Sequence, residues 1–282
     1  MSDEKQAELA KLNRDLRFTP VNPVKARTLT AEQVAFYNTN GYLKPFRIFD
    51  QSQTRANRAY FDFLTAEIEA ADDGRDAYSI NGYQNTCRGL WDLTMTDGIL
   101  DLVADIIGPD IVSWGGDFFC KLAGDPKRVS WHQDAVYWPL TPARTVSAWL
   151  AIDDTDRENG CMQVIPGSHC RGPLALRESD AAEQNVLAAT VIDVEQYGDP
   201  VCFELQAGEI SLHSDMLLHS SEPNRSNRRR CGLTIRYANT AVTADWNFAD
   251  AAILCRGEDP DNNWAHVPQP PGEDTSLRPW QK

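Results

Sequence analysis

The chain after residue 109 is a succession of short β-prone runs, and this pattern restricts the fold more than any other feature. The runs are rich in β-branched and aromatic residues. They cover 111–114, 118–122, 145–152, 162–165, 201–205 and 232–237. Turn-forming pairs such as Asn159-Gly160 and Pro166-Gly167 separate them. Many short strands joined by turns predict antiparallel pairing in two packed sheets, so we expect a mainly β fold with flanking helices.

Three helices are expected before this β-rich part. The first covers 31–40, where Thr30 and Gln33 have the spacing of a capping box. The second covers about 52–70, which has partial helical periodicity. The third starts near residue 96 and ends at Gly108-Pro109, a pair that stops helices.

A single domain over 1–282 is the expected organisation, because no internal repeat or linker divides the chain. Within it we expect a mainly helical part at 1–109 and a β core at 110–240. The proline-rich tail at 257–282 is expected to be irregular. The polar stretch 171–200 reads as an excursion from the core and is a candidate lid.

The composition excludes several classes of partner. The net charge is −14, so the surface repels the phosphates of nucleic acids and anionic membranes. No apolar run approaches the ~18 residues of a membrane span, and no secretory signal is visible. Seven cysteines without a CxxC pair suggest neither a disulfide framework nor structural zinc. We expect a cytoplasmic protein with a small-molecule substrate; a homo-oligomer is left open.

A histidine and a carboxylate two residues apart mark a candidate metal site. If 132–134 is extended, His132 and Asp134 share one face. Of the five histidines, His219 follows an apolar run and precedes a polar one, as at the edge of a pocket. Two histidines and one carboxylate that leave metal positions open form the facial triad of non-haem iron(II) oxygenases. His213 is the competing histidine, and its other interpretation is a hydrogen-bonded residue near the site.

Four segments, in chain order, resemble the phytanoyl-CoA dioxygenase (PhyH-like) family of Fe(II)- and 2-oxoglutarate-dependent oxygenases. They are Trp-His-Gln-Asp-Ala-Val-Tyr-Trp-Pro at 131–139, Ala-Trp-Leu-Ala-Ile-Asp-Asp at 148–154, Glu-Asn-Gly-Cys-Met-Gln-Val-Ile-Pro-Gly-Ser-His at 158–169, and His-Ser-Ser-Glu-Pro-Asn-Arg-Ser at 219–226 with Arg230. The resemblance runs from about residue 30 to 240. It implies a double-stranded β-helix (jelly-roll, cupin-like) that holds Fe(II), with 2-oxoglutarate and O2 as co-substrates.

The resemblance also assigns the metal and cofactor residues. His132, Asp134 and His219 match the iron ligands. Arg230 matches the arginine that pairs with the remote carboxylate of 2-oxoglutarate, which a planar guanidinium grips through two parallel hydrogen bonds. Its eleven-residue distance from His219 distinguishes it from the neighbouring Arg228 and Arg229.

Three more residues are assigned to the cofactor pocket by the same resemblance. Ser221 matches a hydroxyl that assists the remote carboxylate. Trp149 matches an aromatic wall of the pocket, with plain core packing as its alternative. Lys121 lies on a strand before the metal motif, where the family often places a polar residue that contacts the cofactor.

The retained Asp134 indicates hydroxylation, because halogenating members of the family replace this carboxylate with a small residue. The expected reaction hydroxylates a C–H bond while 2-oxoglutarate loses CO2 and becomes succinate. One alternative is a non-catalytic jelly-roll that binds 2-oxoglutarate and metal. Another is a hydroxylase of a lipid, acyl-CoA or secondary metabolite. A zinc hydrolase is disfavoured because the chain has no His-Glu-x-x-His motif.

Residues for substrate binding are less constrained by the sequence. Tyr137 follows the metal motif and is expected to wall the pocket. Asp117, Asn81 and Arg88 lie in polar stretches that could reach its mouth, with surface or turn positions as the alternative. If they line the site, a small polar or zwitterionic substrate fits better than a fatty acyl chain.

Overall fold

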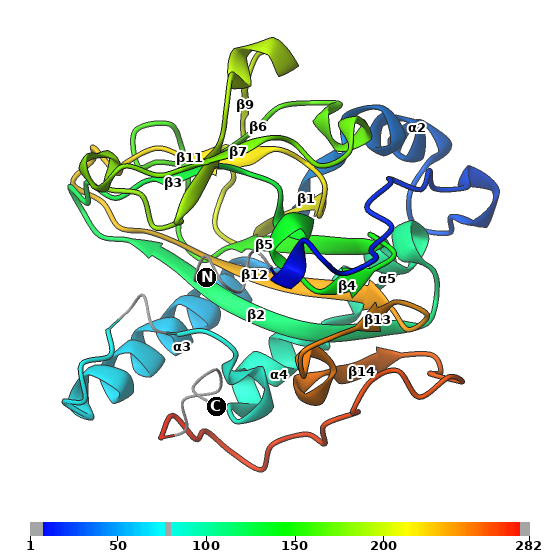
Figure 1. Cartoon of the computed structure of the whole chain (residues 1–282). Coiled ribbons are helices and arrows are strands. Elements are labelled where there is room, and N and C mark those ends of the chain that lie inside the picture. Colours follow the sequence, from blue (N-terminus) through cyan, green and yellow to red (C-terminus); the bar gives the residue numbers. More distant parts are fainter. Residues whose placement is uncertain (1–7, 77–79, 277–282) are drawn as a thin grey trace.

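Two antiparallel sheets make up the centre of the molecule (Figure 1). The computed structural model describes residues 8–76 and 80–276, so the end of the predicted tail lies outside the described residues. In spatial order the six-stranded sheet contains β1 (Tyr42–Arg47), β10 (Glu209–Ser214), β5 (Thr145–Ala151), β12 (Arg230–Asn239), β2 (Ile111–Lys121) and β14 (Ile253–Arg256). The four-stranded sheet contains β3 (Val129–His132), β11 (His219–Ser221), β6 (Met162–Val164) and β9 (Val201–Cys202).

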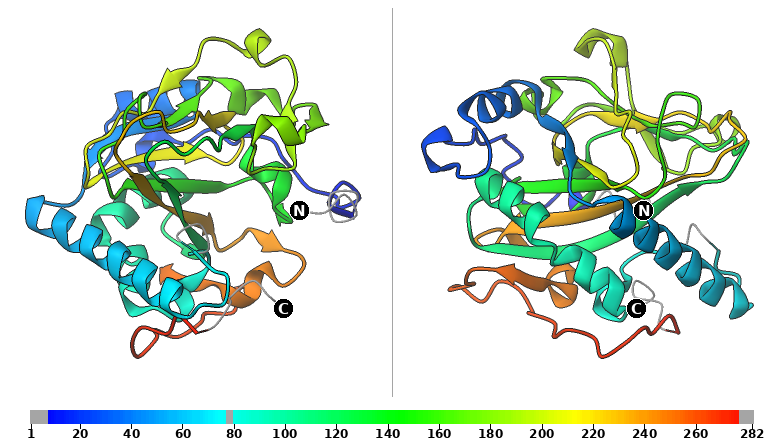
Figure 2. Two further views of the ribbon diagram at one scale, coloured as in Figure 1. Left: turned by 90° about the vertical axis from the view of Figure 1, so that its left-hand side faces the viewer. Right: turned by 180° about the vertical axis from the view of Figure 1, so that it is seen from behind.

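Helices cover the outer face of the six-stranded sheet, and the four-stranded sheet lies over its inner face (Figures 1 and 2). The covering helices are α3 (Gln51–Ala70), α4 (Arg88–Thr94) and α5 (Asp97–Ile107), whereas α2 (Ala31–Asn40) packs next to the edge strand β1. Buried side chains of α3 and α5 form one hydrophobic cluster with the outward side chains of the sheet, such as Leu233 and Ile235. The six-stranded sheet is therefore buried on both faces.

Strand alternation separates core from site on β12. Leu233, Ile235 and Tyr237 belong to the hydrophobic cluster under the helices. Arg230 and Arg236, at even-numbered positions of the same strand, point the other way and line cavities between the two sheets. Because side chains alternate along a strand, one face of β12 packs into the hydrophobic core and the other lines the cavities of the candidate site.

The three predicted helices are confirmed, and the first begins as expected: the Thr30 hydroxyl accepts from the Gln33 amide, and the Gln33 side chain accepts from the Thr30 amide. The sequence did not predict α4. This helix has seven residues and no side-chain cap on Cys87, so local signals are weak. Burial of Leu90 and Trp91 stabilises it instead.

The stretch 171–200 leaves the core as a hairpin-like pair, β7 (Leu176–Glu178) with β8 (Ala189–Val191). The loop between them includes 184–187, which line the larger of the two cavities described below. A second small antiparallel pair consists of β4 (Leu140–Thr141) and β13 (Thr243–Ala244). All seven cysteines are free thiols.

Candidate active site

Three potential metal donors converge between the sheets. His132 ends β3 and His219 begins β11, and the two are directly paired across the antiparallel ladder. Asp134 opens the 3-10 turn that follows β3, which directs its carboxylate back toward both rings. Its Oδ1 lies 3.5 Å from His132 Nε2 and 3.9 Å from His219 Nε2. Among the described residues, this is the single compact group of three metal-binding side chains found.

Backbone carbonyls fix the orientation of both rings. His132 Nδ1 lies 2.8 Å from the carbonyl oxygen of Ser130, and His219 Nδ1 lies 2.9 Å from that of Leu217. Since a carbonyl only accepts, each Nδ1 carries the proton and each Nε2 keeps its lone pair. Both Nε2 atoms face Asp134, which is the arrangement that metal-binding histidines adopt.

The charge states suit a metal as well. Burial alone would raise the pKa of the Asp134 carboxyl, but its close approach to His132, His219 and Arg236 holds the pKa below its usual range. Burial lowers the pKa of His219 to about 3, so its ring is neutral. Ionised carboxylate and neutral imidazole are the forms that bind a metal. Two nitrogens and one hard oxygen on one side of a cavity fit Fe(II).

A cavity of about 190 Å³ adjoins the three donors. Arg230, Ser221 and Trp149 line it, together with Tyr137. The structure therefore brings the residues assigned to the metal and three of the four assigned to 2-oxoglutarate around one space.

Arg230 has hydrogen-bonding capacity to spare for a carboxylate. It is 3% exposed, and its guanidinium lies 5.7 Å from the centre of the Trp149 ring. Nε and Nη2 donate to the Gly160 carbonyl, and Nη1 donates to the Phe119 carbonyl. These bonds use three of five N–H groups, and one N–H on each Nη remains. The buried Ser221 hydroxyl has no partner among the described residues, so it too could bind a ligand.

Lys121 is placed differently from the expectation. It lines the neighbouring larger cavity, and its Nζ donates to the carbonyls of Ser221 (3.2 Å) and Glu222. Burial, and then the charge of Arg230, lower its pKa to about 6. Through these two hydrogen bonds, Lys121 stabilises the backbone at the end of β11.

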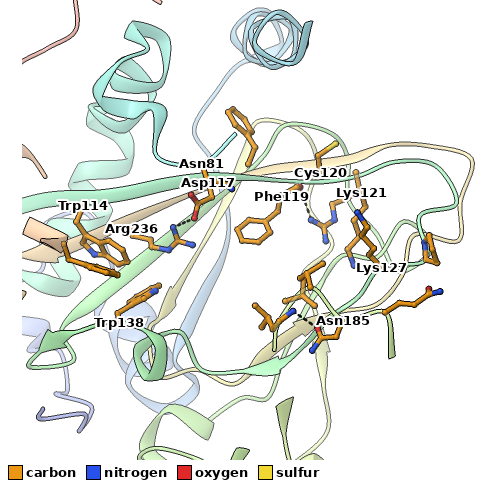
Figure 3. Close-up of a pocket in the computed structure, with 18 residues that line it drawn as sticks. Asn81, Trp114, Asp117, Phe119, Cys120, Lys121, Lys127, Trp138, Asn185 and Arg236 are labelled. Carbon is orange, nitrogen blue, oxygen red and sulfur yellow. Dashed lines mark hydrogen bonds and ion pairs between the residues drawn. The ribbon is translucent and has the colours of Figure 1, made fainter. Parts of the chain in front are cut away.

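The larger cavity, about 900 Å³, opens next to the metal cavity and shares Phe119, Trp138 and Arg236 with it. Asp117 and Asn81 line its wall, as Figure 3 shows. Arg88 is not brought to either cavity. It starts α4 and pairs with Asp92 one turn further along the helix, at 2.9 Å.

Arg236 is a further side chain of the site that the sequence did not predict, whereas His213 lies near the site as expected. Arg236 shares the inner face of β12 with Arg230, and their even spacing was the available signal. His213 is buried in the metal cavity, with its ring centre 5.1 Å from that of His219. The expected hydrogen bond of His213 is not observed, because neither ring nitrogen has a partner in the part of the chain that the structure describes.

The family model for phytanoyl-CoA dioxygenase (PhyH) matches residues 37–232, well over half of the sequence. The chain belongs to the phytanoyl-CoA dioxygenase family. A probable phytanoyl-CoA dioxygenase of Caenorhabditis elegans is 27% identical to this family member over 238 residues, covering 75% of this chain and 76% of the relative.

Solved structures share the fold of this family member. The non-heme monooxygenase ThoJ, in its apo form, has a TM-score of 0.70 at 24% identity, covering 85% of this chain and 88% of ThoJ. CytC3 with Fe(II) and alpha-ketoglutarate has a TM-score of 0.62 at 22% identity, covering 84% of this chain and 92% of CytC3. The predicted jelly-roll class is confirmed.

Family membership and the donor set identify a 2-oxoglutarate-dependent dioxygenase that uses Fe(II), 2-oxoglutarate and O2. None of the described helices has the length and apolarity needed to cross a bilayer. The cytoplasmic location, the single domain and the homo-oligomer stay predictions.

Proposed function

We propose that this dioxygenase hydroxylates a C–H bond of a small polar metabolite, with conversion of 2-oxoglutarate to succinate and CO2. The observation that carries the proposal is the Asp134 carboxylate between His132 and His219. An intact carboxylate favours hydroxylation over halogenation, which in this family accompanies its replacement.

In this proposal His132, Asp134 and His219 hold Fe(II), which supplies the oxidising chemistry when 2-oxoglutarate and O2 are bound. Arg230 grips the remote carboxylate of 2-oxoglutarate with its two remaining N–H groups. Ser221 donates to the same carboxylate. Trp149 excludes water beneath the guanidinium, which strengthens that ion pair.

The larger cavity is the proposed substrate chamber. Its volume of about 900 Å³ suits a small molecule. Tyr137 stands at the metal end, where its hydroxyl has no partner among the described residues. Asp117 and Asn81 add polar groups to the wall of the chamber. These polar groups favour a small polar metabolite over a fatty acyl chain.

Replacement of Asp134 tests the proposal. Asp134→Ala should reduce both Fe(II) binding and succinate release by a factor of about 100 or more, because a ligand and a negative charge are lost. Asp101→Ala, an exposed carboxylate that pairs with Arg256, is the matched control and should retain both. Undiminished succinate release by Asp134→Ala would overturn the ligand assignment.

A further inference from the structure

We propose that Arg236 anchors an anionic group of the substrate, so that the substrate is a small organic acid. This inference rests on the proposed function, because it assigns the substrate class to the same chamber. Arg236 lines both cavities and therefore stands where the substrate chamber meets the metal cavity. A carboxylate held there would leave the rest of the molecule free to extend toward the metal donors.

The Arg236 side chain is held rigidly in place. Its guanidinium carbon lies 5.5 Å from the Trp114 ring centre and 5.3 Å from that of Trp138. Nη1 donates to the Asp117 carboxylate across the ladder between β12 and β2 (Figure 3). A guanidinium fixed on two rings and one carboxylate loses little entropy when it binds a ligand.

Most of the hydrogen-bonding capacity of Arg236 is unused. Asp117 is its single hydrogen-bond partner among the described residues, and its Nε is buried without one. The side chain is only 12% exposed, so bulk water does not readily replace the missing partners. Enclosed donors normally find acceptors, and a substrate carboxylate would supply two.

The charge around the chamber also favours an acid. The protein carries a net charge of −14. The charged side chains that line the chamber are nevertheless four basic ones and one acidic one: Lys121, Lys127, Arg230, Arg236 and Asp117. Arg230 is matched to 2-oxoglutarate, and burial favours neutral Lys121. Arg236 is then the cation nearest the metal end that remains for a second anion.

A matched pair of probes tests the inference. Benzoate and benzamide have the same size but differ in charge. Each is titrated anaerobically into the enzyme loaded with Fe(II) and saturating 2-oxoglutarate. Binding is followed by the change in the visible charge-transfer band of the complex of Fe(II) with 2-oxoglutarate. Wild type should bind benzoate about tenfold more tightly than benzamide, since only the acid forms a charged, bidentate pair with Arg236.

Variants then assign the preference to one side chain. Arg236→Gln should remove the preference. Arg256→Gln replaces a half-buried arginine that pairs with Asp97 and Asp101 and lines neither cavity, and it should keep the preference. Asp117→Asn removes the carboxylate that competes for Arg236 and should increase the preference for benzoate. If Arg236→Gln fails to fold, the result for Asp117→Asn tests the inference. Equal binding of the two probes by wild type, absence of saturable benzoate binding, or an unchanged preference in Arg236→Gln or Asp117→Asn would each overturn the inference.

Arg230→Lys separates this inference from the proposed function. It should weaken 2-oxoglutarate binding by about tenfold through loss of the bidentate pair, yet keep the preference for benzoate once 2-oxoglutarate is saturating. A benzoate preference without iron-dependent succinate release would contradict the proposed function alone. Succinate release without the preference would contradict the role of Arg236 alone.

Discussion

Asp215 is a buried carboxyl directly behind the turn that carries Asp134. Its backbone carbonyl accepts from the Ala135 amide at 2.9 Å, and its Oδ2 accepts from the Thr145 hydroxyl at 2.6 Å. Burial, reinforced by the charge of Asp134, raises its pKa to about 7 despite the hydrogen bond from Thr145. A single residue therefore couples the stability of the metal turn to pH.

Asp215 should make the metal-free protein less stable as the pH rises. Its folded pKa of about 7 lies above the usual 3.8, so the stabilisation is complete below about pH 4 and is lost as the pH rises through 7. Since one pKa unit corresponds to about 1.4 kcal/mol, the loss is on the order of 4 kcal/mol. Asp215→Asn keeps an acceptor for Thr145 and should remove this slope.

Urea unfolding of chelator-treated protein between about pH 4 and pH 8 measures this slope. Asp97→Asn, at an exposed position on α5, is the control and should follow wild type. Parallel pH profiles for wild type and Asp215→Asn would contradict the prediction.

At the scale of elements, the close approach of β12 to β5 shapes the 2-oxoglutarate pocket. Gly232 on β12 lies next to Trp149, and a Cβ at position 232 would overlap the indole ring. The missing side chain lets Trp149 lie beneath Arg230. One glycine on a strand thus makes room for the wall of the pocket.

Gly232→Ala should therefore impair both folding and cofactor binding. Overpacking is expected to destabilise the protein by about 1–3 kcal/mol and to raise the KM for 2-oxoglutarate, because Trp149 must move from beneath Arg230. Gly116→Ala on β2 is the matched control, since its Cβ would meet its nearest neighbours at 3.5 and 3.7 Å, in ordinary contact. Equal unfolding curves and KM values for the two variants would contradict the explanation.

At the scale of the whole molecule, residues near both ends of the described chain form hydrogen bonds with residues far away in the sequence. Near the N-terminal end, Arg14 Nη1 donates to the carbonyls of Ala135 (2.8 Å) and Trp138 (2.7 Å), across the metal turn. Near the C-terminal end, the Glu273 carboxylate accepts from the Tyr60 hydroxyl at 2.5 Å and from the Gly89 amide at 2.9 Å. These contacts connect the N-terminal segment to the metal turn, and the C-terminal segment to α3 and α4.

Arg14→Ala should loosen the metal turn. Hydrogen bonds from a charged group contribute about 1.5–3 kcal/mol, so we expect a loss of that size and faster amide hydrogen exchange within 134–141. Arg17→Ala removes an exposed arginine that pairs with Asp15 and should leave exchange in this segment unchanged. Unchanged amide hydrogen exchange within 134–141 in Arg14→Ala would show that Arg14 does not stabilise the metal turn.

The predictable part of the fold and site is the part encoded by short spacings. The helix 31–40 is predicted by its own cap, and His132 and Asp134 by their two-residue separation. The strand β10 was missed although Ile210 and Leu212 alternate with polar residues, since six residues of weak alternation resemble many loops.

The sequence by itself determined the reaction class, because His132, Asp134, His219 and Arg230 stand in short motifs that can be recognised without knowing the fold. Only the tertiary structure decided which polar residues share the cavities. It turned Lys121 toward backbone carbonyls, left Arg88 with Asp92, and set Arg236 against Asp117. The physical reason is that sequence spacing fixes which face of its own strand a side chain occupies, whereas the register between strands far apart in sequence fixes what it meets there.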